Sequence, residues 1–552
     1  GRAGGGDQMG SAVKIFHNAN LLSFHEGFTP GMADTLVVKD GVIAAIGAYK
    51  EALPIAGDNA QAIDLQGKTL MPGLHDSHIH VWKVGNLKAF MLDVRFASSL
   101  DEMLSLLEEY HRQHPEMDWI IARGFNEAGW KEGRMPTKDD LDKVVTNTPV
   151  YVIRTCAHIA VCNTRAMEIA GITKATPTPA GGVIYKKESG DPNGVFSETA
   201  LGLITSHIPP YTRDQLKTMI KVARAEMYRY GITAATDPAV DPLLLEAYYE
   251  MHAAGELGLR LQAIPILLPD GGNDPYPLPK YFSSDGLTVN TVKFFSDGGL
   301  SGKTAALKRP YKGTAADRGV LRLRKDQYLS LCRSAQDSGL GIATHAIGDA
   351  AIEFVVDIYK ELRSSFPDSL LRIEHLGLPE ERHLRDMAAC DIATSMQTIF
   401  LRELGRNFIK YLDAEYLDRC YPVRAVLDHG ILTALSSDAP VVRDLNPFSG
   451  MGSAITRQDS EGYLIASGEA IRVEETLKAY TLSAARISRL PQLGSLESGK
   501  LADLIILDRD PLRVPPDELT SVKVEATYVG GDCVFSRIRP TGLSTTGSNS
   551  ST

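Results

Sequence analysis

The chain has 552 residues, which exceeds an ordinary domain of about 100–200 residues, although one β/α barrel with an added domain would account for the length. With 43% apolar residues the chain can bury a large core, and its formal net charge of −10 argues against nucleic acid as a partner, because such binding needs a basic surface. No apolar run approaches the roughly 20 residues that span a bilayer, so no membrane partner is expected.

The outermost residues at each end of the chain, 1–11 and 541–552, are predicted to contribute no folded structure. Residues 1–11 carry neither the charged nor the apolar region of a secretory leader, and we expect them to be an appended or disordered lead. Residues 541–552 are expected to be a disordered tail.

The six cysteines are scattered without a Cys-x-x-Cys pair, which indicates thiols in a reducing compartment. The sequence therefore predicts a cytoplasmic protein.

Short apolar runs near both ends of the chain predict β-strands. Asp40-Gly41 lies between two of these runs and is a typical hairpin turn. We expect a composite β-sandwich domain built from residues 12–70 and 495–540. The predicted strands are residues 14–18, 35–39, 42–46, 62–65, 69–71, 503–507, 522–529 and 533–535.

The middle of the chain alternates predicted helices and strands, which is typical of parallel βαβ units. Eight strands favour an α/β fold of the closed (β/α)₈ barrel type over residues 71–494. The long gap after the first strand predicts an inserted subdomain over residues 95–200, with strands at 119–123 and 150–154. Helices are expected at 213–230, at 326–338 and after Asp349, which is a candidate N-cap. The eight barrel strands are predicted near residues 70–74, 233–236, 259–266, 289–295, 341–345, 371–375, 391–397 and 432–437.

Polar side chains gather at the carboxyl ends of these strands, where the active site of a β/α barrel lies. His78 and His80 are two residues apart, and in an extended segment both imidazoles point to the same side. An isolated His-x-His is more often structural or exposed. However, His345, His375 and Asp438 each end a different predicted strand, and this coincidence predicts a metal site.

Lys293 lies inside the apolar strand Thr-Val-Lys-Phe-Phe, where an unpaired ammonium group would be costly to bury. In one interpretation, Lys293 points inward and pairs with an acid such as Asp297. In the other, CO₂ adds to the neutral amine and gives a lysine carbamate, an anionic ligand that bridges two cations. The sequence alone leaves both interpretations open.

Several motifs in the chain resemble the amidohydrolase superfamily, and specifically its family 3 branch, which includes N-substituted formamide deformylases. The likeness covers roughly residues 12–536 and extends to the inserted segment. After Lys293 the chain reads Asp297-Gly-Gly-Leu-Ser, where relatives usually have an early Ser, so the pocket shape is the uncertain part. The matching motifs are Met71-Pro-Gly-Leu-His-Asp-Ser-His-Ile-His80, Val292-Lys-Phe-Phe-Ser-Asp-Gly298, His345-Ala-Ile-Gly-Asp349, Arg372-Ile-Glu-His375, Ser436-Ser-Asp438 and Gly494-Ser-Leu-Glu-Ser-Gly-Lys.

The resemblance implies two divalent metal ions, with zinc first in order and manganese, iron or cobalt as alternatives. His78, His80 and Asp438 would bind one ion, and His345 and His375 the other. Lys293, as a CO₂-derived carbamate, would bridge them. Asp438 would be the catalytic base and then the acid. The rival interpretation of Asp438 is an N-cap at the corner between strand and helix.

The implied reaction is hydrolysis of a C–N amide bond in a small-molecule substrate, with N-formyl or N-acyl amines as the leading class. The alternatives keep the fold but change the chemistry to a cyclic amide or lactone hydrolase, a deaminase or a decarboxylase. A non-catalytic binding protein is the third hypothesis. A homodimer is the expected oligomer, from base rates alone.

Candidate substrate contacts lie outside the metal motifs. His158 in the insertion is either a packed histidine or a catalytic contact to the substrate. Trp82, Phe125 and Trp130 could wall an apolar pocket, although such aromatics are more often core. Gly298 is expected to face the pocket. Beside these, Asp76 should brace its strand or bond a ligand histidine, and His383 and His429 are expected to be surface or helix-capping residues.

Overall fold

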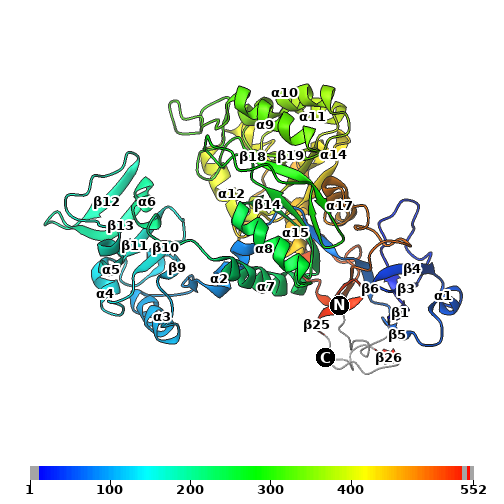
Figure 1. The fold of residues 1–552 in the computed structure, drawn as a ribbon. Helices are drawn as coiled ribbons and strands as arrows, with labels where there is room; N and C mark the ends of the chain where they lie inside the picture. Colours follow the sequence, from blue (N-terminus) through cyan, green and yellow to red (C-terminus); the bar gives the residue numbers. More distant parts are fainter. Residues whose placement is uncertain (1–11, 538–543, 547–552) are drawn as a thin grey trace. The chain divides into compact units, whose positions relative to one another are not determined.

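The computed structural model describes residues 12–537 and 544–546 (Figure 1). It divides into two compact units, one made of the chain up to Val81 together with the chain from Arg224 onward, and the other of Trp82–Ala223. The second unit contains the predicted insertion 95–200 and extends beyond both of its predicted bounds. The predicted lead lies outside the described residues. In the predicted tail only Ser544–Thr546 are described, and they form strand β26.

Strands from the two ends of the chain pair with each other in the first unit. Strand β6 pairs antiparallel with β23, so the N- and C-terminal segments share one sheet, and residues of both sheets, among them Phe16, Leu36, Leu504 and Tyr528, form one hydrophobic core. The two terminal segments therefore share a sheet and a core, while the composite β-sandwich domain stays a prediction. One sheet has the order β26-β5-β1-β3-β4 and the other β2-β6-β23-β24-β25. Their strands are β1 (Val13–His17), β2 (Asn20–Leu21), β3 (Thr35–Lys39), β4 (Val42–Gly47), β5 (Gln61–Asp64), β6 (Thr69–Pro72), β23 (Leu504–Leu507), β24 (Val524–Val529), β25 (Asp532–Ser536) and β26 (Ser544–Thr546).

The rest of the first unit contains parallel strands in two hydrogen-bonded sheets, ordered β7-β14-β15-β17-β16 and β18-β19-β20-β21-β22, with only the short β16 antiparallel. Several backbone contacts connect these sheets. Ile266 and Lys293 form a parallel bridge, and the Asp438 backbone N–H donates to the His78 carbonyl over 2.8 Å. The strands are β7 (Leu74–Asp76), β14 (Ile232–Val240), β15 (Arg260–Pro265), β16 (Phe282–Ser283), β17 (Leu287–Val289), β18 (Thr291–Phe295), β19 (Gly341–Ala346), β20 (Leu371–His375), β21 (Ala393–Met396) and β22 (Thr433–Leu435).

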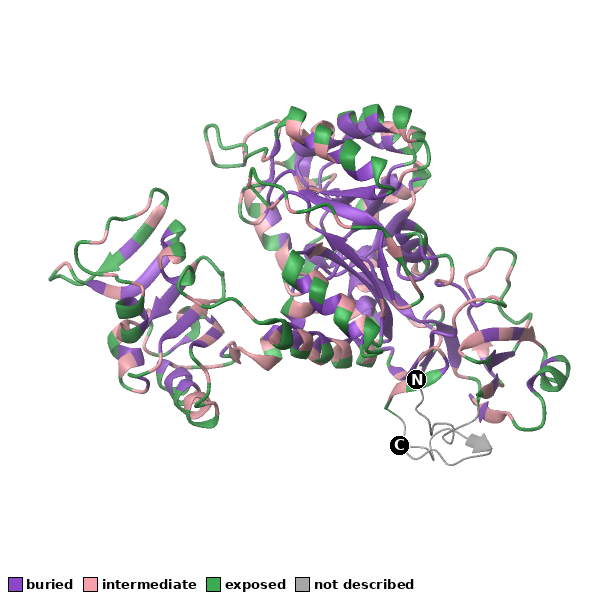
Figure 2. Ribbon diagram, in the orientation of Figure 1, coloured by how far each residue is buried: buried purple, intermediate pink, exposed green. Residues whose placement is uncertain are grey.

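Helices follow these strands and turn one face toward them. In α10, for example, Ile352, Val355, Val356 and Tyr359 are buried at helical spacing, while the opposite face is exposed. Figure 2 shows the same contrast, with buried purple strands and helices that are green on their outer faces. The helices are α1 (Tyr49–Ala56), α7 (Arg213–Arg229), α8 (Pro242–Ala253), α9 (Lys325–Asp337), α10 (Asp349–Ser365), α11 (Glu381–Ala389), α12 (Ile399–Tyr411), α13 (Ala414–Leu417), α14 (Val423–Asp428), α15 (Pro447–Thr456), α16 (Val473–Ala479) and α17 (Leu482–Ser488).

The second unit is a six-stranded mixed sheet with helices on its faces, ordered β12-β13-β11-β10-β9-β8. Two separate hydrophobic clusters, one containing Leu104 and Phe125 and the other Tyr151 and Phe196, give it a core of its own. The strands are β8 (Leu92–Asp93), β9 (Ile120–Phe125), β10 (Val150–Arg154), β11 (Ile159–Cys162), β12 (Gly182–Lys186) and β13 (Pro192–Glu198), and the helices are α2 (Val81–Ala89), α3 (Leu100–Gln113), α4 (Lys138–Asp142), α5 (Thr164–Ile169) and α6 (Gly202–Thr205).

Two predicted strands are divided in the structure. The first predicted barrel strand, residues 70–74, is split at Gly73, so that β6 belongs to the terminal sheet and β7 to the parallel sheet. The reason is visible in the backbone, because Gly73 donates to Asp503 whereas Leu74 donates to Gly231. The predicted strand 289–295 is likewise interrupted at Asn290, whose side chain donates to the Ser488 carbonyl.

Asp349 is not the N-cap of α10, because Gly348 occupies that position. The Asp349 carboxylate instead accepts hydrogen bonds from the backbone N–H of Lys308 and from the Tyr416 hydroxyl, 2.9 and 2.8 Å away. Asp349 therefore fixes two other segments onto the start of the helix.

Among the described residues, no helix has the length and apolar character needed to cross a bilayer.

Candidate metal centre

Three of the predicted ligands meet at one carboxylate oxygen. His78 and His80 follow β7, and their Nε2 atoms lie 3.2 and 3.0 Å from Oδ1 of Asp438, which follows β22. This buried oxygen accepts no hydrogen bond of suitable geometry from the described residues. Oxygen and nitrogen lone pairs are thereby concentrated at a point where a cation would satisfy all of them.

The histidines of two neighbouring strands extend this cluster. The His375 ring at the end of β20 lies 4.7 Å from that of His78 and 4.5 Å from that of His345 in β19, measured between ring centroids. Candidate ligand atoms of His78, His375 and Asp438 all lie within 4.8 Å of one another. Nε2 of His345 is 3.0 Å from the Gly298 carbonyl oxygen. The structure therefore brings the predicted histidine and aspartate ligands into one cluster.

Lys293 is buried in β18, with 1% of its surface exposed. Burial lowers the pKa of its ammonium group to about 8, although the negative charges of Glu374 and Asp438 oppose the shift. Lys293 does not pair with Asp297, which accepts backbone N–H groups of Ala306, Ile347 and Gly348 instead. The interpretation of an inward Lys293–Asp297 ion pair is therefore wrong, and the lowered pKa makes the neutral amine more accessible than in an exposed lysine.

The members of the cluster differ in the direction in which their pKa values are shifted. Burial would raise the pKa of Asp438, but His78 and His80 hold it well below its usual range. Burial lowers the pKa of His78, yet Asp438 and Glu374 together leave it raised. The pKa of His375 is well below its usual value because the ring is buried and lies beside His345 and His78. Asp438 and His375 are therefore in the forms that bind a metal ion, whereas the raised pKa of His78 means that metal binding there would displace a proton.

Sequence reasoning gave no role to the residues that support these ligands. Nδ1 of His78 lies 2.8 Å from Glu374, and Nδ1 of His375 lies 2.5 Å from Oε1 of Gln397. Glu374 is in turn held by Arg372. The signal available in the sequence was the alternation Arg372-x-Glu374 in a strand that is buried on both faces, because two charged residues at that spacing point to one side.

Asp76 braces the strand, as one of its two predicted roles required. Its carboxylate accepts from the backbone N–H of His78 and from both the backbone N–H and the hydroxyl of Ser437. Burial raises the pKa of Asp76 to about 6, although these hydrogen bonds oppose the shift. Asp76 therefore ties the segment that carries His78 to the segment that carries Asp438.

The predicted pocket residues other than Gly298 lie in the second unit. Phe125 and Trp130 are corrected to core residues, because both are buried and their ring centroids are 5.7 Å apart within one hydrophobic cluster. Trp82 is half-buried and its ring lies 6.2 Å from Tyr211. His158 is exposed, with Nδ1 3.2 Å from a Glu198 oxygen.

Gly298 lies in the first unit, where its carbonyl faces His345. A Cβ at this position would lie 2.1 Å from Oγ1 of Thr304, so a side chain does not fit. Gly298 can therefore contribute only its backbone to the surroundings of the cluster.

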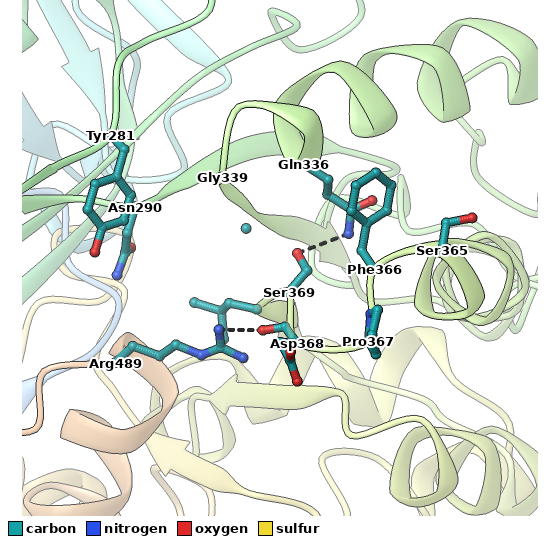
Figure 3. Close-up of a pocket in the computed structure, with 12 residues that line it drawn as sticks. Tyr281, Asn290, Gln336, Gly339, Ser365, Phe366, Pro367, Asp368, Ser369 and Arg489 are labelled. Atoms are coloured by element: carbon teal, nitrogen blue, oxygen red, sulfur yellow. Dashed lines mark hydrogen bonds between the residues drawn. The ribbon is translucent and has the colours of Figure 1, made fainter.

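A cavity of about 400 Å³ lies at the other end of the parallel strands (Figure 3). It is lined by Asn290, Gly341 and Leu370, which stand at or just before the starts of β18, β19 and β20, whereas the histidines stand at the strand ends. Gln336 donates to Ser369 at its wall. This cavity is therefore separate from the metal centre.

Comparison with known proteins identifies the family. Residues 61–535 match the model of the Amidohydrolase family, so the chain belongs to this family and is an amidohydrolase, which confirms the resemblance seen in its motifs. The N-substituted formamide deformylase of Arthrobacter pascens is 30% identical over 529 residues, covering 92% of this chain and 95% of that protein. YtcJ of Bacillus subtilis (strain 168) is 29% identical over 533 residues, covering 93% of this chain and 99% of its own.

Solved structures agree with this assignment. An uncharacterized metal-dependent hydrolase from Pyrococcus furiosus is 25% identical and superposes with a TM-score of 0.76, covering 91% of this chain and 100% of that chain. Its counterpart from Pyrococcus horikoshii shares the fold, with a TM-score of 0.77.

Proposed function

We propose that the protein is a metal-dependent hydrolase of C–N amide bonds, with N-formyl and N-acyl amines as its substrate class. The convergence of His78 and His80 on the buried Oδ1 of Asp438 is the observation that carries the proposal. The likeness to an N-substituted formamide deformylase supports the substrate class. We infer further that the eight parallel strand positions close into a (β/α)₈ barrel, that the enzyme is cytoplasmic and that it forms a homodimer.

The donor set fits two divalent ions, of which zinc suits the histidine and carboxylate ligands best. His78, His80 and Asp438 would hold one ion and His345 and His375 the other. The buried Lys293, once it carries a carbamate, would bridge them. When bound, such ions supply Lewis acidity and lower the pKa of coordinated water toward about 7.

Asp438 is placed to move the proton in the reaction. It is a carboxylate at neutral pH, so it can accept a proton from the attacking water as the new C–O bond forms. As the C–N bond breaks, Asp438 returns this proton to the departing amine nitrogen. The products are one carboxylic acid and one amine, and no oxidant or further reactant is consumed.

The test is turnover of a panel of N-substituted formamides and larger N-acyl amines by zinc-loaded enzyme. We expect release of formate or of the longer acid together with the amine. Asp438→Asn should lower kcat by about 10²–10⁴-fold, the usual contribution of a positioned acid–base group. Asp386→Asn, which removes a half-buried carboxylate of α11 that pairs with Lys360, is the matched control and should leave kcat unchanged.

Product analysis separates the rival chemistries. Release of ammonia alone would indicate a deaminase and release of CO₂ a decarboxylase. Turnover of cyclic amides or lactones without any open-chain amide would indicate the cyclic hydrolase. No turnover of the whole panel by enzyme that carries its metal would refute the amide-hydrolase proposal.

A further inference from the structure

A fully buried ion pair lies directly behind the metal centre. Arg372 and Glu374 have no exposed surface, and both point to the same side of β20 because they are two residues apart. Nε and Nη2 of the guanidinium donate to Oε2 and Oε1 of the carboxylate over 2.6 and 2.8 Å. A buried bidentate pair of this kind is costly to desolvate and gives little net stability, so its presence calls for another explanation.

Besides Arg372, the Glu374 carboxylate contacts His78, which is a candidate metal ligand. Oε1 of Glu374 lies 2.8 Å from Nδ1 of His78, and Arg372 also donates to the Ser77 carbonyl beside it over 3.0 Å. Both carboxylate oxygens of Glu374 accept hydrogen bonds from the Arg372 guanidinium, so Glu374 faces His78 as a hydrogen-bond acceptor. A carboxylate can only accept a hydrogen bond, so Nδ1 of His78 carries a proton, and in the neutral ring the lone pair then lies on Nε2.

The His375 side of the cluster uses a neutral acceptor in the same place. Oε1 of Gln397 faces Nδ1 of His375, while Nε2 of Gln397 donates to Ser436 and to the Ser395 carbonyl, which fixes the orientation of the amide. His375 is thereby also set with its lone pair on Nε2. The two rings differ in one respect, since only His78 is backed by a charge.

We infer that Arg372 and Glu374 are positioning residues that hold His78 in its Nδ1-protonated form and direct its Nε2 lone pair at the metal centre. Glu374 orients the ring, and Arg372 orients Glu374 and neutralises its charge. The inference rests on the proposed function, because it assigns a role toward the metal that His78 would bind. Removal of such supporting hydrogen bonds weakens metal binding by roughly 10–100-fold.

The test measures zinc affinity with a competing chelator, so it needs no substrate. Glu374→Gln should weaken zinc binding by roughly 10–100-fold and change the visible absorption spectrum of the cobalt-loaded protein. Glu475→Gln is the matched control. It replaces a part-buried glutamate of α16 that pairs with Arg424 away from the centre, and it should leave both readouts unchanged.

Because Glu374→Gln leaves Arg372 unpaired, the variant could lose stability instead. The double variant Arg372→Met/Glu374→Met removes both charges and keeps the volume, a replacement that buried ion pairs tolerate. It should unfold near the wild-type temperature when free of metal and still bind zinc roughly 10–100-fold more weakly. Zinc affinity within about twofold of wild type in both variants would overturn the inference. A wild-type protein that binds no zinc would refute the metal centre itself.

Discussion

Residues of the metal centre adopt backbone conformations that L side chains rarely use. His375 has a φ of 83° and Asp438 a φ of 56°, both in the left-handed region. Neither is a glycine, so each conformation costs free energy that the surrounding contacts must offset. Both residues stand where a strand ends and the chain turns sharply. Left-handed residues at these two places bring side chains from different strands to one point.

Lys293 is the candidate bridging ligand of the site, and this role can be tested directly. Its side chain is buried with a lowered pKa, and no ion pair to it occurs among the described residues. Lys293→Met, which keeps length but removes the amine, should reduce bound zinc from two ions per chain to one or fewer, because the bridging ligand is lost. Elemental analysis after dialysis measures this.

Lys360→Met is the matched control for this experiment. Lys360 is half-exposed and pairs with Asp386 on the helical surface, so its loss should leave the zinc content unchanged. Retention of two zinc ions by Lys293→Met would show that Lys293 is not a ligand and would leave it an ordinary buried lysine.

At the scale of the element, helix α11 shows how a buried histidine can serve as a cap. Nδ1 of His383 accepts the backbone N–H of Glu380 over 2.9 Å, and Nε2 lies 3.3 Å from Glu353. The ring must be neutral to accept that bond. The expectation of a capping role is confirmed, whereas the alternative of a surface position is wrong, because the residue is buried. Burial lowers its pKa to about 4, with Lys308 and Arg382 acting in the same direction and Glu380 and Asp349 opposing.

This cap makes a specific prediction for pH. Between about pH 6.5 and 4 the unfolded chain binds a proton at His383 and the folded chain does not, so stability falls as pH falls through this window and is fully present above it. His383→Gln should flatten this dependence, because glutamine at the same helix position can also accept the Glu380 N–H. Urea unfolding midpoints at neutral and acidic pH measure the effect.

An equal loss of stability in the His383→Gln variant and in wild type over that pH range would contradict the assignment. His429→Gln is a suitable control, since the His429 ring bonds the Ala425 carbonyl of its own helix end. Its pH dependence should match that of wild type.

At the scale of the whole molecule, the metal centre joins parts of the chain that are far apart. Its candidate ligands come from β18, β19 and β20 and from the segments that follow β7 and β22. The unfolded chain does not hold these groups together, so metal ions should bind the folded state alone. Each ion at 100 times its dissociation constant then stabilises the fold by about 2.7 kcal/mol.

Thermal unfolding with and without zinc checks this coupling. Wild type should unfold at a higher temperature as free zinc increases, and His375→Asn should lose most of that response because one ligand is missing. His429→Asn, a histidine outside the centre, should keep the full response. An unfolding temperature that is independent of zinc in wild type would contradict the coupling.

Much of this organisation could be predicted from the sequence. Strand and helix positions followed from apolar periodicity, and in several cases, such as β3 and β20, the predicted bounds agree with those of the structure. The candidate ligands were visible because polar residues at the ends of apolar strands are unusual in themselves. Periodicity and residue type are local properties, so they can be recognised directly in the amino-acid sequence.

Other features depended on contacts that no local pattern encodes. The division of the first predicted strand between two sheets at Gly73 depends on partners at residues 231 and 503. The burial of Phe125 and Trp130 depends on a core assembled within the second unit. The Arg372–Glu374 pair behind His78 joins strands that are almost 300 residues apart in sequence.

The sequence by itself therefore determined which residues could bind a metal, because that depends on side-chain chemistry and strand position. Only the tertiary structure decided which of them meet at Asp438, which group holds each imidazole and which charges are left to compensate Lys293. The physical reason is that hydrogen bonding and desolvation depend on distances of a few ångströms between groups remote in the chain, and those distances exist only once the sheets have formed.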